Sequence, residues 1–377
     1  MANFDSHAEK LWDMFLSLAN EQYTDTAEKA SKFPEMNRYI NIVPWDSCAV
    51  EIDTPRGNYI NASLFDRDGF KLILAQAPLP ESFESFWAMV YQHNVPIVVK
   101  LATETTHPMP PCHRYAPFPE DAQWYGDYLV VSARSTIPPQ VKTMIQYLPN
   151  LHEVSVYRGQ NDKSPHTVTI AHDPVWPDNG IPQNVALLLN YILLTLRLTE
   201  GLKFPPVIHC SAGVGRTGTF AAILLCLAPL LIYITSYRLV SPDGSLISPY
   251  SNRAKSAESH CFDLRAFEGD VQATKIISQL RPIFPDLIVE LRHTRHPQMV
   301  QTPDQMGLAM NTVLGFIEYI GLGKQIPPWL KEMKPLLNKV CRPCTPNEFV
   351  TAFFPQITNS RDAIQQRVIP IPVLDTI

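Results

Sequence analysis

The sequence predicts an α/β fold of the α+β type, in which a central, mixed and twisted sheet is flanked by helices. The chain has 377 residues, of which 45% are hydrophobic, and this is enough to bury a large core. Short apolar runs of strand length alternate with longer segments that carry apolar residues at helical spacing. The 35 prolines make up nearly double the usual share of about 5%, and they are scattered through short connections. These features favour many loops between short elements of both kinds.

The individual elements follow from local patterns. Strands are expected at the short apolar runs Ala49–Ile52, Lys71–Ala75, Val95–Leu101, Tyr128–Val131, Thr167–Ala171 and Pro206–His209. Helices are expected at the amphipathic segment around Leu11 to Leu18 and at Glu81–His93, Asn184–Leu198 and Met306–Ile320.

The uncharged segment from Gly218 to Tyr237 has nearly the length of a membrane span, which is about 20 residues. Pro229 interrupts this segment, and the segment directly follows a glycine-rich loop that could not enter a lipid headgroup layer. We therefore expect no membrane span here but a buried core helix that ends near Pro229.

Charge and cysteine usage narrow the classes of function. The net charge is −5, from 31 basic and 36 acidic residues, and it predicts no nucleic-acid partner. Seven widely spaced cysteines and a polar N-terminus predict a reduced, cytoplasmic protein. Cys341 and Cys344 form a lone CxxC pair, for which an incidental pairing is favoured over a zinc site. No metal or cofactor is expected.

The stretch HCSAGVGRTG, from His209 to Gly218, is typical of an anion-binding loop that carries a nucleophile. Cys210 ends a buried strand, and a helix is expected to begin near Gly215. If the loop curls around the sulfur, its backbone amides converge there, and the helix N-terminus adds its positive dipole end. The amides are those of Ser211, Ala212, Gly213, Val214, Gly215 and Arg216.

Arg216 has the planar guanidinium that can hold two oxygens of a tetrahedral dianion. The same positive surroundings would keep Cys210 ionised near neutral pH. Thr217 can donate its hydroxyl to the sulfur and ease its departure. His209 either orients the loop through its ring nitrogens or is a buried structural histidine.

A thiolate alone does not expel a poor leaving group, so the chemistry needs an acid. Trp176-Pro-Asp178 places an aspartate on a loop bounded by proline and glycine, which is suited to closing over a ligand. Asp178 is therefore the candidate general acid. An alternative interpretation is a dinucleotide-binding oxidoreductase, because Gly213 to Gly218 also satisfies GxGxxG, but the long apolar segment that follows disfavours it.

Together, HCSAGVGRTG and the upstream WPDNGIP resemble the cysteine-dependent protein tyrosine phosphatases. Further stretches resemble that family in the same order, namely NRY at Asn37–Tyr39, NYINAS at Asn58–Ser63, QAPLP at Gln76–Pro80, and QTPDQ at Gln301–Gln305. The resemblance covers about residues 37 to 320. It implies the family's fold, its hydrolysis of phosphotyrosine proteins through a phosphocysteine intermediate, and a role in signalling.

The resemblance also implies roles for individual residues. Tyr39 would flank the phosphotyrosine ring and set the pocket depth, which excludes the shorter phosphoserine. Gln301 and Gln305 would place the hydrolytic water, and Glu104 would orient Arg216. The resemblance implies that Asp178 first protonates the leaving phenolate and then acts as base toward that water.

Several positions depart from the family pattern. Asn41 replaces an aspartate, Pro111 a lysine and Ala116 a tryptophan, and residues 228–272 form an atypical insertion. Asn41, Pro111 and the insertion suggest an alternative hypothesis, a pseudophosphatase that binds phosphotyrosine proteins without efficient turnover, although the acid, the nucleophile and the arginine are all present. The expected organisation is a helical N-terminal extension at 1–34, a phosphatase domain at 35–320 and a C-terminal tail at 321–377.

Overall fold

The structure is a computed structural model that describes residues 15–18, 23–105, 110–132, 150–237, 239–240, 246–247, 260–263, 271–278, 280–319 and 368–371. The predicted mixed sheet has eight strands in the order β1-β2-β8-β3-β7-β6-β5-β4. The strands are β1 (Ala62–Arg67), β2 (Phe70–Ala75), β3 (Ile97–Lys100), β4 (Ala122–Tyr125), β5 (Tyr128–Ser132), β6 (Leu151–Arg158), β7 (His166–His172) and β8 (Val207–His209).

The four central strands, β2, β8, β3 and β7, run parallel, whereas β1 on one side and β6, β5 and β4 on the other pair antiparallel. Ala75 of β2 and Lys100 of β3 both align with His209 of β8. The carboxyl ends of these parallel strands therefore meet at one edge of the sheet. That edge is where a ligand site is expected, and the chain leaves β8 there at Cys210.

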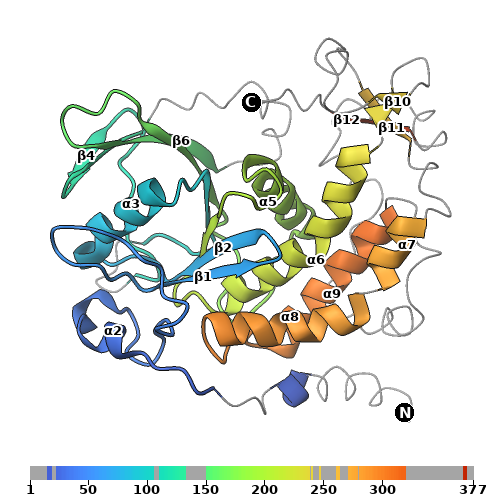
Figure 1. Ribbon diagram of the computed structural model, residues 1–377, viewed down its shortest axis with the longest axis horizontal. Helices are drawn as coiled ribbons and strands as arrows, with labels where there is room; N and C mark the ends of the chain where they lie inside the picture. Colours follow the sequence, from blue (N-terminus) through green and yellow to red (C-terminus); the bar gives the residue numbers. More distant parts are fainter. Residues whose placement is uncertain are drawn as a thin grey trace.

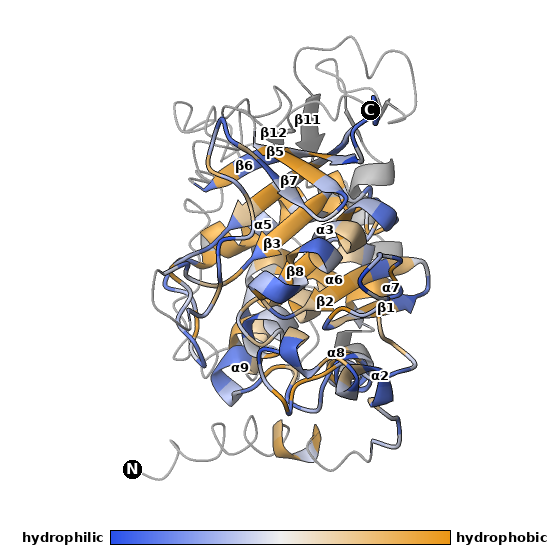
Figure 2. Cartoon of the chain, turned by 90° about the vertical axis from the view of Figure 1, so that its left-hand side faces the viewer, coloured by the Kyte–Doolittle hydropathy of each residue, from blue (hydrophilic) through white to orange (hydrophobic). Residues whose placement is uncertain are grey.

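Helices cover both faces of the sheet (Figure 1). One face packs on α3 (Phe83–Gln92), and the other packs on α5 (Val185–Leu198), α6 (Gly215–Tyr237), α8 (Leu280–Thr294) and α9 (Pro303–Tyr319). Successive residues of β2 point to opposite faces: Leu72 and Leu74 belong to the core with α6, and Ile73 to the core with α3. Figure 2 shows the resulting hydrophobic colouring of the central strands.

Most predicted elements are confirmed within a few residues, but the strand predicted at Ala49–Ile52 is wrong. Only Ala49 forms an isolated bridge, to Ser63 of β1. Val50 and Ile52 are buried in the core. Their apolar character therefore reflects packing without a strand ladder. The local patterns also did not predict the strands β1, β4 and β6 or the helices α7 (Val271–Ser278) and α8.

The helix predicted to end near Pro229 continues to Tyr237, with Pro229 inside it. A proline inside a helix removes one backbone hydrogen bond and clashes with the preceding turn. Here the preceding turns are packed in the core through buried side chains such as Leu224 and Leu227. Tertiary packing therefore overrides the local signal. None of the helices in the described residues has the length and apolar character that a membrane span requires.

The predicted insertion and the predicted C-terminal tail are joined through a separate four-stranded sheet, in the order β10-β9-β11-β12. Its strands are β9 (Leu239–Val240), β10 (Leu246–Ile247), β11 (His260–Asp263) and β12 (Val368–Ile371). The pairing of β11 with β12 is antiparallel. Most of both segments, and most of the predicted N-terminal extension, lies outside the described residues; within the extension, residues 15–17 and α2 (Glu28–Ser31) are helical.

Candidate active site

Cys210 lies where β8 passes into the loop that precedes α6. Its side chain is 2% exposed. The amide of Gly213 donates a hydrogen bond to Cys210 Sγ at 3.3 Å. The loop is attached to the end of β2, because the amide of Ala77 donates to the carbonyl of Ser211 at 2.9 Å. The chain therefore curls around the sulfur at the carboxyl edge of the parallel strands.

The surroundings of Cys210 favour its ionised form. Burial opposes ionisation, yet the pKa of the thiol is lowered, because the Arg216 guanidinium and hydrogen bonding from Thr217 and Gly213 outweigh it. The Thr217 hydroxyl is buried without a hydrogen bond of normal geometry, but it lies near enough to the sulfur to contribute. By contrast, burial raises the pKa of Cys112 to about 11 and that of Cys226 to about 12.

Gly213 has φ +78°, and a Cβ added there would lie 2.2 Å from the Ala75 carbonyl oxygen. Gly159 is a matched control, because its φ is +73° and nothing lies within 4 Å of an added Cβ. We expect Gly159→Ala to lower the free energy of unfolding by about 1 kcal/mol through backbone strain. Gly213→Ala should lower it by roughly 2 kcal/mol more, because the backbone of β2 must also move. Urea denaturation measures both losses, and equal losses would contradict this close packing.

Arg216 connects two loops: residues 210–216, called the signature loop, and residues 173–184, called the acid loop because they carry the candidate acid. Its guanidinium is buried, Nη1 donates to the Trp176 carbonyl at 3.1 Å, and Nη2 contacts Asp178 Oδ1 at 2.9 Å. Trp176 is 1% exposed, and its Nε1 donates to the Gly180 carbonyl at 3.0 Å. The acid loop therefore lies over the signature loop, and its carboxylate is paired with the guanidinium.

Glu104 does not orient Arg216, contrary to the expectation from the resemblance. Its carboxylate pairs with Lys100, and with Arg114 at 2.9 Å. Arg216 Nε is buried and has no hydrogen-bond partner among the described residues. The physical reason is the buried ammonium group of Lys100 on β3. Lys100 lies four residues before Glu104 and takes the Glu104 carboxylate as its counter-ion.

Asp173 is a buried carboxylate at the start of the acid loop that the sequence interpretation did not single out. It is 2% exposed, and Oδ1 accepts a hydrogen bond from the amide of Val175 at 3.0 Å. Burial raises the pKa of Asp173, although the amides of Val175 and Trp176 and the charge of Arg216 act against this rise. An aspartate directly after a strand and two residues before an amide donor is a typical turn-capping pattern, which could have identified it.

The buried ring of His209 links the backbone of the signature loop to Tyr115. Nδ1 lies 3.1 Å from the Cys210 carbonyl oxygen and Nε2 lies 2.9 Å from the Tyr115 hydroxyl. Burial lowers the pKa of His209 to about 3, so the ring is neutral. Because a carbonyl only accepts, Nδ1 carries the hydrogen and Nε2 accepts from Tyr115.

Gln301 and Gln305 lie beside the first turn of α6. A Cβ at Gly215 would lie 2.1 Å from Gln301 Oε1. Gln305 Oε1 accepts a hydrogen bond from the backbone amide of Gln301 at 2.9 Å. Gln305 Nε2 donates to the backbone carbonyl of Gly180 in the acid loop at 3.3 Å. Val300 has φ +58°, which is rare for a β-branched residue, and such strain is often retained at functional sites.

The remaining predicted residues lie around the same loop. The Tyr39 hydroxyl is 3.0 Å from Ser211 Oγ, so the tyrosine forms one wall above the loop. The Asn41 side chain is exposed, and its backbone carbonyl lies 3.0 Å from His296 Nε2. The Ala212 carbonyl accepts from Arg295 at 3.2 Å, and Val214 is fully buried.

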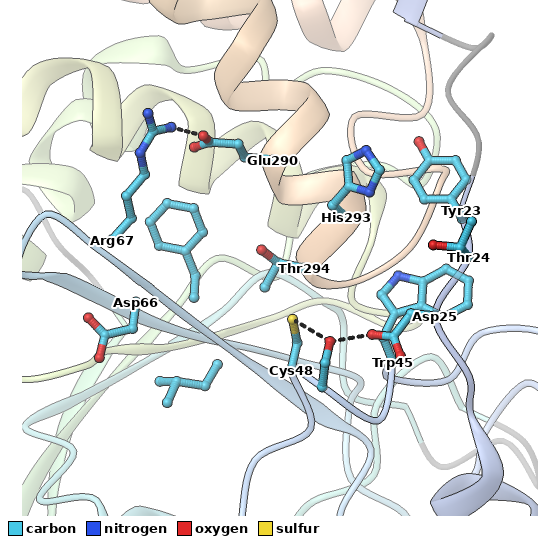
Figure 3. A pocket seen from close by; sticks show the side chains of 13 residues that line it. Tyr23, Thr24, Asp25, Trp45, Cys48, Asp66, Arg67, Glu290, His293 and Thr294 are labelled. Carbon is cyan, nitrogen blue, oxygen red and sulfur yellow. Dashed lines mark hydrogen bonds and ion pairs between the residues drawn. The ribbon is translucent and has the colours of Figure 1, made fainter.

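A cavity of about 280 Å³ opens above this loop, and its lining includes Tyr39, Ser211, Arg216, Asp178, Trp176, Val175 and prolines 110, 111, 174 and 177. A larger cavity of about 470 Å³ lies elsewhere, between Tyr23, Trp45, β1 and α8 (Figure 3). It contains the Cys48 thiol but no residue of the signature loop. The smaller cavity is therefore the candidate active site.

Within the described part of the chain, no group of three or more histidine, cysteine or acidic side chains is arranged to hold a metal ion. The pair Cys341 and Cys344 lies outside the described residues.

Comparisons with known proteins agree on one family. A family model described as protein-tyrosine phosphatase matches residues 33–232. Tyrosine-protein phosphatase non-receptor type 2 of Homo sapiens is 32% identical over 230 residues, which make up 58% of this chain and 53% of that protein. Receptor-type tyrosine-protein phosphatase eta of Gallus gallus is 33% identical over 194 residues, or 50% of this chain and 13% of that protein. The chain thus spans about half of the non-receptor relative and a small part of the receptor-type one.

Proposed function

Because this chain belongs to the protein-tyrosine phosphatase family, we propose that it hydrolyses phosphotyrosine in proteins through a cysteinyl-phosphate intermediate. The observation that carries the proposal is the buried thiol of Cys210, whose pKa is lowered by Arg216 and by donors of its own loop. A thiolate held among anion-binding groups is a nucleophile placed where a phosphate would sit. The contact of Tyr39 with Ser211 supports the role that the resemblance gives this tyrosine, which is to set a pocket depth that admits an aryl phosphate and keeps a phosphoserine from the sulfur.

In the first step the thiolate of Cys210 attacks phosphorus, the S–P bond forms, and the bond from phosphorus to the phenolic oxygen breaks. Arg216 and the loop amides hold the three equatorial oxygens as charge develops on them. Asp178 gives its proton to the departing phenolate, which leaves as neutral tyrosine. Asp178 contacts Arg216, so a phosphate that binds the guanidinium would displace the Asp178 carboxyl group, which carries the proton that it gives to the phenolate.

In the second step a water molecule attacks the cysteinyl phosphate. Gln301 and Gln305 hold this water, and Asp178, now a carboxylate, accepts its proton. The new O–P bond forms, the S–P bond breaks, and the electron pair returns to sulfur, where Thr217 helps to stabilise the thiolate. Inorganic phosphate leaves, and no metal or cofactor enters either step.

The cysteines bear on the compartment in which this chemistry works. Cys48, Cys112, Cys210 and Cys226 are all free thiols. The mechanism needs Cys210 in its reduced state, so we place the protein in a reducing compartment such as the cytoplasm, with a role in phosphotyrosine signalling.

A pseudophosphatase is the second candidate, because two observations work against turnover. Within the part of the chain that the structure describes, Arg216 Nε has no hydrogen-bond partner, and Asp178 competes with phosphate for the guanidinium. Phosphate release from a phosphotyrosine peptide, compared with the same peptide carrying phosphoserine, decides between the candidates. We expect release from phosphotyrosine alone. Binding of the peptide without release would support the pseudophosphatase, and neither binding nor release would contradict both.

A further inference from the structure

Exposed apolar side chains gather at the mouth of the candidate active site. Among the seven large apolar side chains that are exposed in the described part of the chain, Tyr39 is 40%, Ile40 89% and Val175 69% exposed. Tyr39 and Val175 line the active-site cavity, and Ile40 directly follows Tyr39 in the chain. Single exposed apolar residues are common on protein surfaces, but a group of them around one opening indicates a contact surface.

Local structure holds two of these side chains in place. Ile40 and Asn41 are the central residues of a turn that is closed by the hydrogen bond from the Ile42 amide to the Tyr39 carbonyl, at 3.2 Å. Val175 is fixed by its own amide, which donates to the buried carboxylate of Asp173. Both apolar side chains are therefore presented to solvent by ordered backbone.

The charges at the mouth disfavour acidic partners. Among the described residues, the charged side chains that line this cavity are Arg38, Asp178 and Arg216. Arg216 is buried at the floor, and the guanidinium of Arg38 donates to the carbonyls of Ala77, Pro78 and Pro110 at 2.6 to 3.3 Å. Asp178 is 69% exposed. An acidic residue beside the phosphotyrosine would thus meet the exposed Asp178 at the mouth, and it would find the Arg38 guanidinium already hydrogen-bonded to backbone carbonyls.

We propose that the preferred substrates carry apolar residues next to the phosphotyrosine, and that Ile40 and Val175 select them. This inference rests on the proposed phosphatase function, because any peptide whose phosphotyrosine reaches Cys210 must lay its neighbouring residues across the mouth. Apolar neighbours would cover Ile40 and Val175 and remove their side chains from water. Burying about one such side chain changes affinity by roughly tenfold.

The test compares two phosphotyrosine peptides that differ only in having leucine or glutamate on both sides of the phosphotyrosine. kcat/KM is measured by phosphate release for the wild-type protein, Ile40→Lys and Val271→Lys. Val271 is the matched control, because its side chain is 83% exposed on α7, whereas Ile40 directly follows Tyr39 of the cavity lining. We expect the wild-type protein and Val271→Lys to prefer the leucine peptide by about tenfold. Ile40→Lys should lose or reverse this preference.

Hydrolysis of p-nitrophenyl phosphate by the wild-type protein distinguishes a failure of the apolar preference from a failure of the proposed phosphatase function. If it is hydrolysed but the two peptides are turned over equally, the apolar preference is wrong and the phosphatase function stands. An unchanged preference in Ile40→Lys would likewise remove Ile40 from substrate selection. If neither the peptides nor p-nitrophenyl phosphate are hydrolysed, the proposed function itself fails.

Discussion

Cys210→Ser is expected to lower phosphate release from phosphotyrosine by on the order of 10⁴-fold or more, as is usual when a catalytic nucleophile is removed. A serine hydroxyl is not ionised near neutral pH, and the donors that stabilise the Cys210 thiolate cannot turn it into a comparable nucleophile. The backbone amides and Arg216 remain in place, so the variant should still bind a phosphotyrosine peptide. Calorimetric titration measures binding, and phosphate release measures turnover.

Cys48→Ser is the matched control for this experiment. The Cys48 thiol lies in the larger cavity, 3.5 Å from Ser47 Oγ and away from the signature loop (Figure 3). Its replacement should leave phosphate release within about twofold of the wild-type rate, because the nearest consequence is a changed contact with Ser47. Comparable turnover in Cys210→Ser and the wild-type protein would overturn the assignment of the nucleophile.

Asp178→Asn is expected to lower kcat for a phosphotyrosine peptide by about 10²- to 10⁴-fold, the usual contribution of a positioned general acid. Asparagine has nearly the same shape as aspartate but no proton to give to the leaving phenolate. Loss of the carboxylate also removes the pairing with Arg216, so binding of phosphate or vanadate should be retained or tightened. The expected signature is therefore a large loss of kcat with an unchanged or lower KM.

The leaving group provides an internal check on the role of Asp178. Tyrosine is a poor leaving group, with a pKa of about 10, whereas p-nitrophenol ionises more readily and needs less help from an acid. The loss of rate in Asp178→Asn should therefore be smaller for p-nitrophenyl phosphate than for the peptide. Equal losses for the two substrates would show that Asp178 acts through the structure of the loop rather than as the acid.

The central fold was predictable because buried parallel strands are short and continuously apolar. β3 and β8 have this character up to their last residues, Lys100 and His209, and the helices α5 and α6 that cover them are also largely apolar. The errors arise where packing overrides local patterns. Val50 is buried without belonging to a strand, and Pro229 lies inside a helix that its neighbours hold in place. Helix α8 was missed because Pro285 interrupts its apolar pattern.

The chemistry of the site was more predictable than its supporting contacts. Cys210, Arg216 and Asp178 follow from residue types at characteristic spacing, and the fold brings the guanidinium to both the sulfur and the carboxylate. The ion-pair partner of Glu104 could not be predicted from residue types and spacing. It depends on the buried ammonium of Lys100 on a neighbouring strand, and sequence spacing carries no information about that competition.

The central claim is that the signature loop keeps Cys210 ionised near neutral pH, and alkylation by iodoacetate tests it most directly. The thiolate is the reactive form, so a lowered pKa preserves the reaction at acidic pH and makes the rate fall only below that pKa. We predict that mass spectrometry finds Cys210 alkylated at pH 6 while Cys112 and Cys226 are spared, with a midpoint below the ordinary thiol value of about 8.5 and protection by inorganic phosphate. A midpoint at or above that ordinary value, or no protection by phosphate, would contradict the account.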